Sequence, residues 1–319
     1  MTKIYNTISD MDSFYLTLEW YENGSINQWQ LYTNNWWVGY YKMKNKFYSD
    51  SDIITFDDYL NFGEKKCFSK NKKTLLISLW CGNSEVEKRL LWKFTKENDY
   101  NITYLWIDSS DKMLKMSVEN LKELNVDYSF IRADFTSQNL VQELKEIEND
   151  YDETIYAFFW QTFWNIKHTK IINILYNLLD KWEKIWLDAA LRKENSLNDD
   201  LDLHTIYSEY INDTWFNRLL TDKLLDDGIN KSNGDLLLET TKINDINALM
   251  FTFSFIFKKL STIKIRNTKL TFLPDSKIEL LKIHRFNPNN FIDFFNDFWF
   301  SLQDKQIKWY RGQFLFEKK

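Results

Sequence analysis

Between residues 74 and 189, short apolar runs alternate with longer amphipathic stretches, and this alternation limits the chain to one class of fold. The apolar runs cover residues 74–80, 102–107, 127–132, 154–160 and 184–189. The stretches between them, at 84–97, 110–124, 137–149 and 166–181, combine charged residues with apolar residues at helical spacing. Strand and helix signals in alternation predict βα units around a parallel sheet. The sequence therefore predicts an α/β fold with a doubly wound sheet.

The ends of these apolar runs are the first place to look for a site. Right-handed crossovers place every strand end that precedes a helix along one edge of the sheet. Ligands of open parallel sheets bind at that edge. The residues that follow each run are therefore the candidate binding residues.

The rest of the chain divides around this alternating region. Residues 1–62 are polar and aromatic-rich, and we expect them to form an N-terminal cap segment, followed by a Rossmann-like domain at 63–192. Residues 193–285 break the alternation with mixed helical sequence, and an insertion of this size predicts a subdomain rather than a loop. Residues 286–319 contain a helix that starts near Pro288 and strands that complete a seven-stranded sheet.

Composition excludes several classes of protein. The net charge of -5 and the pI near 5.5 argue against a broad nucleic-acid-binding surface. Only Cys67 and Cys81 occur, which excludes a disulfide framework and a four-thiolate zinc site, and three scattered histidines form no metal motif. No apolar run reaches about 18 residues and no leader pattern is present. We expect a cytoplasmic protein without metal, nucleic-acid or membrane partners, and favour a monomer.

The first run ends in the turn Trp80-Cys81-Gly82-Asn83, directly before a helical stretch. A glycine turn here would let the backbone approach a ligand closely, because glycine reaches positive φ and has no side chain. Trp80 as written would obstruct that approach. A dinucleotide dehydrogenase is disfavoured, since no third glycine follows at the G-x-G-x-x-G offset.

The next runs end in residues suited to a nucleoside. Asp108 and Ser109 follow the second run, where an acid can accept hydrogen bonds from both ribose hydroxyls or simply cap the next helix. Asp134 and Phe135 follow the third run, where an acid can meet an adenine amine and a ring can cover the base. The fourth run ends in Phe159 and Trp160, in a segment polar enough to line a pocket.

The order of these motifs resembles class I S-adenosylmethionine-dependent methyltransferases, from about Lys72 to Arg192 and again from about Pro288 to the end. The resemblance implies S-adenosyl-L-methionine as cofactor. It assigns the ribose to Asp108, with Ser109 beside it, the adenine to Asp134 and Phe135, and the methionine portion to Gly82 with the residue at 80.

A narrower resemblance concerns the segment from Phe159 to Asn165. With glycine at 160 and 164, this segment is similar to the L-G-S-T-I-G-N turn of the histidine-specific N-α-methyltransferases of ergothioneine biosynthesis. The resemblance makes Asn165 the residue that orients the acceptor, and Tyr41 is a candidate only from its place in the aromatic N-terminal segment. Where that family carries Glu-x-Ser, this chain has Leu281-Lys282-Ile283, so the acceptor need not be histidine.

Tryptophan stands where these motifs need glycine. The chain has 14 Trp and 7 Gly, although roughly 22 Gly are expected for this length. Trp80, Trp106, Trp160 and Trp164 all occupy such positions. Three explanations compete: a gene in which UGA encodes glycine but is translated as tryptophan, a decayed enzyme with a plugged pocket, or an aromatic surface that stacks on sugars or bases.

The sequence favours the first explanation, because decay scatters substitutions of many types and an aromatic surface would not follow strand-end turns. The predicted function is methyl transfer from S-adenosylmethionine to a small amine-bearing acceptor. The alternative is an inactive methyltransferase-like scaffold that binds a partner or ligand through its tryptophans. The state of residue 80 decides between them.

Overall fold

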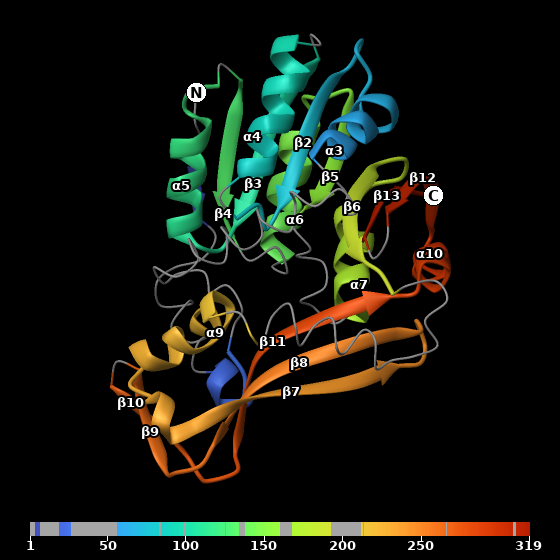
Figure 1. Cartoon of the computed structure of the whole chain (residues 1–319). Helices are drawn as coiled ribbons and strands as arrows, with labels where there is room; N and C mark the ends of the chain where they lie inside the picture. Colours follow the sequence, from blue (N-terminus) through green and yellow to red (C-terminus); the bar gives the residue numbers. More distant parts are fainter. Residues whose placement is uncertain are drawn as a thin grey trace. The chain divides into compact units, whose positions relative to one another are not determined.

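The computed structural model describes residues 4–6, 19–26, 56–82, 84–97, 100–124, 126–133, 138–159, 168–192, 212, 214–265, 267–308 and 311–319. Contacts divide the chain into two compact units (Figure 1). The first comprises residues 1–8, 48–191 and 286–319, and the second comprises residues 9–47 and 192–285. The inserted segment thus forms a unit together with part of the N-terminal segment.

The first unit is built on an eight-stranded sheet with the order β1-β4-β3-β2-β5-β6-β13-β12. Its strands are β1 (Ile4–Asn6), β2 (Lys73–Leu79), β3 (Asn101–Asp108), β4 (Tyr128–Arg132), β5 (Glu153–Phe158), β6 (Lys184–Ala190), β12 (Phe300–Lys308) and β13 (Arg311–Lys318). The strands from β1 to β6 are parallel to their neighbours, whereas β13 is antiparallel to both β6 and β12. The predicted seven-stranded, doubly wound α/β fold is confirmed, with β1 as a short additional edge strand.

Helices connect these strands as the sequence predicts. They are α3 (Phe56–Phe62), α4 (Glu85–Trp92), α5 (Asp111–Leu121), α6 (Gln138–Glu148), α7 (His168–Leu178) and α10 (Pro288–Asp297). π-helical turns extend α3 over Gly63–Cys67 and α4 over Lys93–Glu97. Pro288 occupies the first turn of α10, and the Asn287 side chain accepts hydrogen bonds from the backbone N–H groups of Asn289 and Asn290.

The core of this unit follows the period of two along each strand. On one face, alternate side chains such as Leu76, Trp106 and Trp186 form a buried cluster with residues of α3, α4 and α5. On the other face, Phe314 and Phe316 of β13 pack against α10 through Phe291 and Phe295. Helices therefore cover both faces, and functional side chains are left to the edges of the sheet.

The second unit is mostly β structure. It contains α9 (Thr214–Asp226), a three-stranded sheet of β7 (Gly234–Ile243), β8 (Ala248–Phe257) and β11 (Lys277–Phe286), and the hairpin of β9 (Ser261–Ile265) and β10 (Thr268–Phe272). The expectation of mixed helical sequence is wrong for residues 248–257, which form the central strand β8. Among the described residues, no helix is long and apolar enough to span a bilayer.

Candidate functional site

The turn after β2 lies beside the end of β3, at the carboxyl edge of the parallel sheet. Leu79 and Ile107 are register partners, and the Trp80 N–H continues the pairing with a 2.9 Å hydrogen bond to the Ile107 carbonyl. Gly82 then donates its N–H to Oδ2 of Asp108 over 3.2 Å. The two residues that the sequence assigned to one ligand are therefore in direct contact. They also lie near the switch between β2 and β5, where strand order reverses.

Asp108 is a buried carboxylate held by backbone groups. Its Oδ1 accepts a 2.8 Å hydrogen bond from the Ser110 N–H, and Oδ2 accepts the one from Gly82. Burial raises the pKa of Asp108 to about 7, although these N–H groups pull in the opposite direction. Ser110 itself caps α5, because its side chain accepts from the Met113 N–H. Asp108 thus anchors the turn, and its oxygens retain lone pairs for further donors.

The backbone of the turn is left-handed at alternate residues. Trp80 has φ 56°, Gly82 has φ 60° and Ser84 has φ 57°. A Cβ placed on Gly82 would meet no atom within 4 Å, so this residue faces open space. For a bulky residue such as tryptophan, positive φ is a true outlier. The backbone at residue 80 therefore has the conformation that glycine adopts most readily.

A buried polar network supports the turn from beneath. The Ser117 hydroxyl of α5 donates to the Gly82 carbonyl over 2.9 Å, and the Ser84 hydroxyl lies 3.0 Å from Ser117 Oγ. In the preceding strand, Ser78 donates to Oε1 of the fully buried Glu87 over 2.8 Å. Sequence reasoning missed Ser117 and Glu87, because only tertiary contact shows that α4 and α5 face this turn.

The remaining predicted residues fall into three groups. Ser109 has a buried hydroxyl to which the described residues offer no hydrogen-bond partner, which is unusual for a buried polar atom. Cys81 and Phe159 are each 1% exposed and turn their side chains into the core, and burial raises the pKa of the Cys81 thiol. Only their backbones are available to a ligand. The residues Tyr41, Asn83, Asp134, Phe135, Trp160, Trp164 and Asn165 lie outside the described part of the chain.

Trp106 differs from Trp80. It lies inside β3 rather than in a turn, is fully buried, and stacks between Tyr104 and Phe130 at centroid distances of 5.2 and 5.5 Å. The expectation that residue 106 belongs to a glycine turn is therefore wrong. An extended backbone accepts any residue, so this position does not require glycine.

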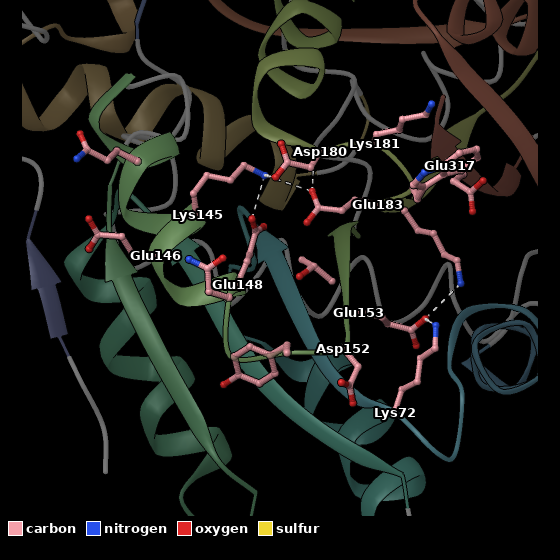
Figure 2. Close-up of a pocket in the computed structure, with 16 residues that line it drawn as sticks. Lys72, Lys145, Glu146, Glu148, Asp152, Glu153, Asp180, Lys181, Glu183 and Glu317 are labelled. Atoms are coloured by element: carbon pink, nitrogen blue, oxygen red, sulfur yellow. Dashed lines mark hydrogen bonds and ion pairs between the residues drawn. The ribbon is translucent and has the colours of Figure 1, made fainter.

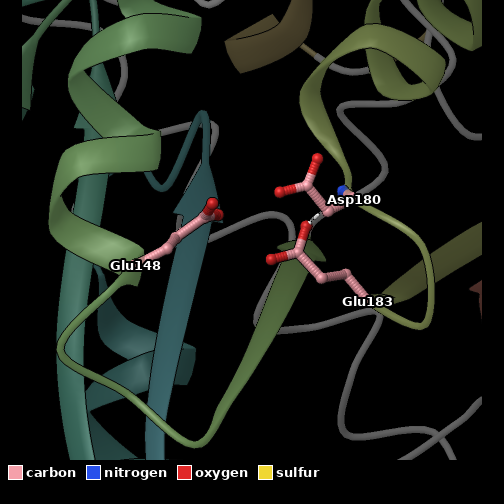
Figure 3. A group of neighbouring side chains, drawn as sticks. All are labelled: Glu148, Asp180 and Glu183. Carbon is pink, nitrogen blue, oxygen red and sulfur yellow. Dashed lines mark hydrogen bonds between the residues drawn. The ribbon is translucent and has the colours of Figure 1, made fainter.

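The opposite edge of the same sheet carries a cluster of charged residues that the sequence did not reveal. Lys145 of α6 lies 2.9 Å from Glu148, 3.1 Å from Asp180 and 3.4 Å from Glu183 (Figure 2). Figure 3 shows the three carboxylates by themselves. Burial, and next the charge of Glu148, raise the pKa of Glu183 to about 7. These residues line part of a polar pocket of about 760 Å³ at the amino ends of β2, β5 and β6. The charge-rich turns that precede two strands were the only sequence signal for it.

The acidic oxygens of Glu148, Asp180 and Glu183 lie within 4.8 Å of one another, a spacing that a metal ion would accept. The ammonium of Lys145 already contacts all three carboxylates and offsets part of their charge, and the Tyr156 hydroxyl donates to Glu148. The cluster is therefore an internal ion-pair network. It lies away from the strand ends at which ligands of such sheets bind.

Comparisons with known proteins give similarity of fold. No family model and no curated protein matches this sequence. A solved S-adenosylmethionine-dependent methyltransferase from Clostridium acetobutylicum is 11% identical, with a TM-score of 0.46, and covers 87% of this chain and 98% of its own. One from Anabaena variabilis is 13% identical, with a TM-score of 0.40, covering 87% and 93% respectively.

A third solved structure is the 1,6-didemethyltoxoflavin-N1-methyltransferase of Burkholderia thailandensis, with S-adenosylhomocysteine bound. It is 7% identical, with a TM-score of 0.43, and the match covers 89% of this chain and 85% of that one. Because the identities and TM-scores are this low, the functional assignment below depends on the residues of this chain.

Proposed function

We propose that this protein is an S-adenosylmethionine-dependent methyltransferase, with the cofactor at the carboxyl edge of β2, β3 and β4. One observation carries the proposal: the contact between the Gly82 turn and Asp108 at the switch point of the sheet. A glycine turn next to a strand-end carboxylate is suited to a nucleoside with an extended polar tail, because the backbone can approach the tail while the acid accepts from the ribose.

Three features of the described residues fit that group. Asp108 can accept from ribose hydroxyls with the lone pairs that its backbone partners leave. Ser109 offers a buried hydroxyl that forms no hydrogen bond with the described residues. Gly82 borders open space in which a Cβ would meet nothing. Asp134 and Phe135 are assigned to the adenine from the sequence alone.

The bound cofactor supplies a methyl group that its sulfonium makes electrophilic. The protein's own contribution is to align the acceptor with that methyl group and to keep water out. An amine acceptor attacks as the free base, so it must lose a proton to a nearby base or water. We propose a small amine-bearing acceptor, oriented by Asn165 with Tyr41 as a second candidate. By the same family resemblance, residues 193–285 are proposed as the substrate cap. Histidine is the first acceptor to test, from the Phe159–Asn165 resemblance.

Residue 80 decides whether the written chain can bind the cofactor. We propose that residues 80, 160 and 164 are glycine in the working enzyme and are specified by UGA codons that the source reads as glycine. The left-handed backbone at 80 supports this proposal. Random decay of an enzyme would not place tryptophan preferentially at left-handed positions. Residue 106 is left out, since its strand backbone and its stacked ring are compatible with tryptophan.

The test is binding of S-adenosylhomocysteine to the chain with W80G, W160G and W164G, measured by titration calorimetry beside the written chain. We expect binding by the triple variant and at least a tenfold weaker affinity for the written chain. W92G, which alters an exposed tryptophan of α4, is the matched control and should bind as the written chain does. Absence of binding by the triple variant would contradict the cofactor assignment and leave the inactive scaffold as the better description.

A further inference from the structure

Tryptophan occupies left-handed backbone positions far from the candidate cofactor turn. In the described part of the chain, six residues other than glycine have positive φ: Trp80, Ser84, Trp182, Asn247, Asp275 and Trp299. Asn and Asp are the usual non-glycine residues of this region, and large side chains are rare there. Half of these positions therefore hold the residue type least expected at them.

Trp299 ends helix α10 in the manner of a glycine cap. It is the residue after the C-cap Phe298, has φ 67°, and donates its N–H to the Asn296 carbonyl over 3.2 Å. Gly228 ends α9 in the same way, with φ 93° and an N–H bond of 2.9 Å to the Leu225 carbonyl. This position favours glycine because its backbone is left-handed. The same motif in one chain thus holds glycine once and tryptophan once.

Trp182 occupies the glycine position of a tight turn. The Glu183 N–H closes the turn onto the Asp180 carbonyl over 3.2 Å. Its third residue, Trp182, has φ 77°, whereas Lys181 before it is not left-handed. This pattern is that of a type II turn, whose third position requires positive φ and is normally glycine. The Trp182 N–H also donates to the Lys318 carbonyl, which fixes the turn against β13.

Neither tryptophan is buried, and the Trp182 ring makes an exposed cation–π contact with the Lys181 ammonium, 4.8 Å from its centroid, which is worth roughly 0.5 to 1 kcal/mol. Trp182 and Trp299 are 64% and 63% exposed, whereas Trp186 is fully buried and donates from Nε1 to Gln313 over 3.1 Å. Both exposed residues lie at the amino edge of the sheet, next to the end of β13, because the Lys319 N–H donates to the Trp299 carbonyl. Loss of a cofactor pocket at the other edge would not place tryptophan in these turns.

We propose that residues 182 and 299 are glycine in the protein that its source organism produces. The reassigned codon would then act on the whole chain rather than on the cofactor turn. The tryptophans divide by backbone: left-handed positions are glycine sites, and buried strand positions such as Trp186 are accounted for by packing. This inference does not depend on the cofactor assignment, and each can fail without the other.

The direct experiment is tandem mass spectrometry of peptides from the protein isolated from its source cells. The expected result is glycine at residues 182 and 299. Tryptophan at either position would overturn the proposal. Binding of S-adenosylhomocysteine plays no part in this readout, so a failed cofactor assignment would leave the result unchanged.

A second experiment tests the backbone requirement in the recombinant protein. We compare the melting temperatures of proteins that carry Trp, Ala or Gly at 182, and likewise at 299. Position 92 is the matched control, because Trp92 is 50% exposed but lies on a right-handed helix. We expect Gly to melt roughly 1 to 3 °C above Ala at 182 and 299, and below Ala at 92. Ala equal to or above Gly at 182 or 299 would show that these turns do not require glycine, and would overturn the proposal.

Discussion

The two edges of the parallel sheet contain similar components and differ in how their charge is balanced. Each has a turn with a left-handed tryptophan and a carboxylate whose pKa is raised to about 7, Asp108 at the carboxyl edge and Glu183 at the amino edge. At the amino edge the Lys145 ammonium lies among three carboxylates. At the carboxyl edge Asp108 accepts hydrogen bonds from the backbone N–H groups of Gly82 and Ser110. The carboxylates of the amino edge are therefore already paired with a cation of the protein. At the carboxyl edge, Asp108 can still accept hydrogen bonds from a ligand.

The largest expected effect is on ligand binding at the carboxyl edge. In the chain with glycine at 80, 160 and 164, D108N should weaken S-adenosylhomocysteine binding about 100-fold, or about 2.7 kcal/mol, because two hydrogen bonds to a charged acceptor become weaker. Stability should also fall, because the amide that replaces the carboxylate has one acceptor oxygen, whereas Asp108 accepts from two backbone N–H groups. Calorimetry and thermal unfolding measure the two effects. E146Q, at an exposed carboxylate near the other edge, is the control.

The next effect is on stability at the amino edge. K145M should lower the free energy of unfolding by about 2 kcal/mol, because three carboxylates lose the ammonium between them. Ligand affinity should stay the same. K181M, at an exposed lysine of the same pocket, should cost less than about 0.5 kcal/mol. Equal effects of the two substitutions in urea unfolding would remove the contrast between the edges.

The raised pKa of Asp108 predicts pH-dependent binding. Below about pH 7 the buried carboxyl carries a proton and accepts poorly from ribose hydroxyls, and above it the carboxylate is charged. Affinity for S-adenosylhomocysteine should therefore rise about tenfold, or about 1.4 kcal/mol, from pH 6 to pH 8. The titration repeated with D108N should be flat. If the chain that keeps Asp108 and has glycine at 80, 160 and 164 bound with the same affinity over this range, the ribose assignment would be contradicted.

The smallest effect is on the pH dependence of stability at the amino edge. Because the pKa of Glu183 is raised from 4.5 to about 7 on folding, the folded state binds more protons between these values. The Glu183 contribution to stability is thus greatest below about pH 4.5, decreases as pH rises to about 7, and is constant above that. At pH 8, E183Q should raise the free energy of unfolding by about 1 kcal/mol relative to the unsubstituted chain. In urea unfolding, this difference should vanish toward pH 5. An advantage independent of pH would contradict the shift.

The sequence predicts the parallel half of the sheet because each strand there is a short apolar run between amphipathic helices. It also predicts that Gly82 and Asp108 meet, since parallel strands end at one edge. It fails for residues 248–257, because a long apolar run also fits a buried helix, although Phe251, Phe253 and Phe255 alternate there with Thr252 and Ser254 as in a strand. The assignments of Asn165, Tyr41, Asp134 and Phe135 stay predictions.

The amino-edge cluster could not be predicted for a different reason. Glu148 and Glu183 are far apart in sequence, and each is an ordinary charged residue at the end of a helix or before a strand. Only the parallel pairing of β5 with β6 brings the two turns together. Knowledge of the strand order alone would have placed these two turns on one edge of the sheet. It would not have predicted that Lys145 contacts both carboxylates.

The position of β13 has a consequence for how the protein is made. Its eight residues, Arg311–Lys318, are made after all the other strands of this sheet, yet they lie inside the sheet between β6 and β12. The sheet therefore stays open until β13 has been made, although domains generally fold from the N-terminus during synthesis. A ribosome that read UGA at codon 299 as a stop signal would release a chain without this interior strand. Such a truncated protein would lack an interior strand of its sheet, and no residue at position 80 could correct that defect.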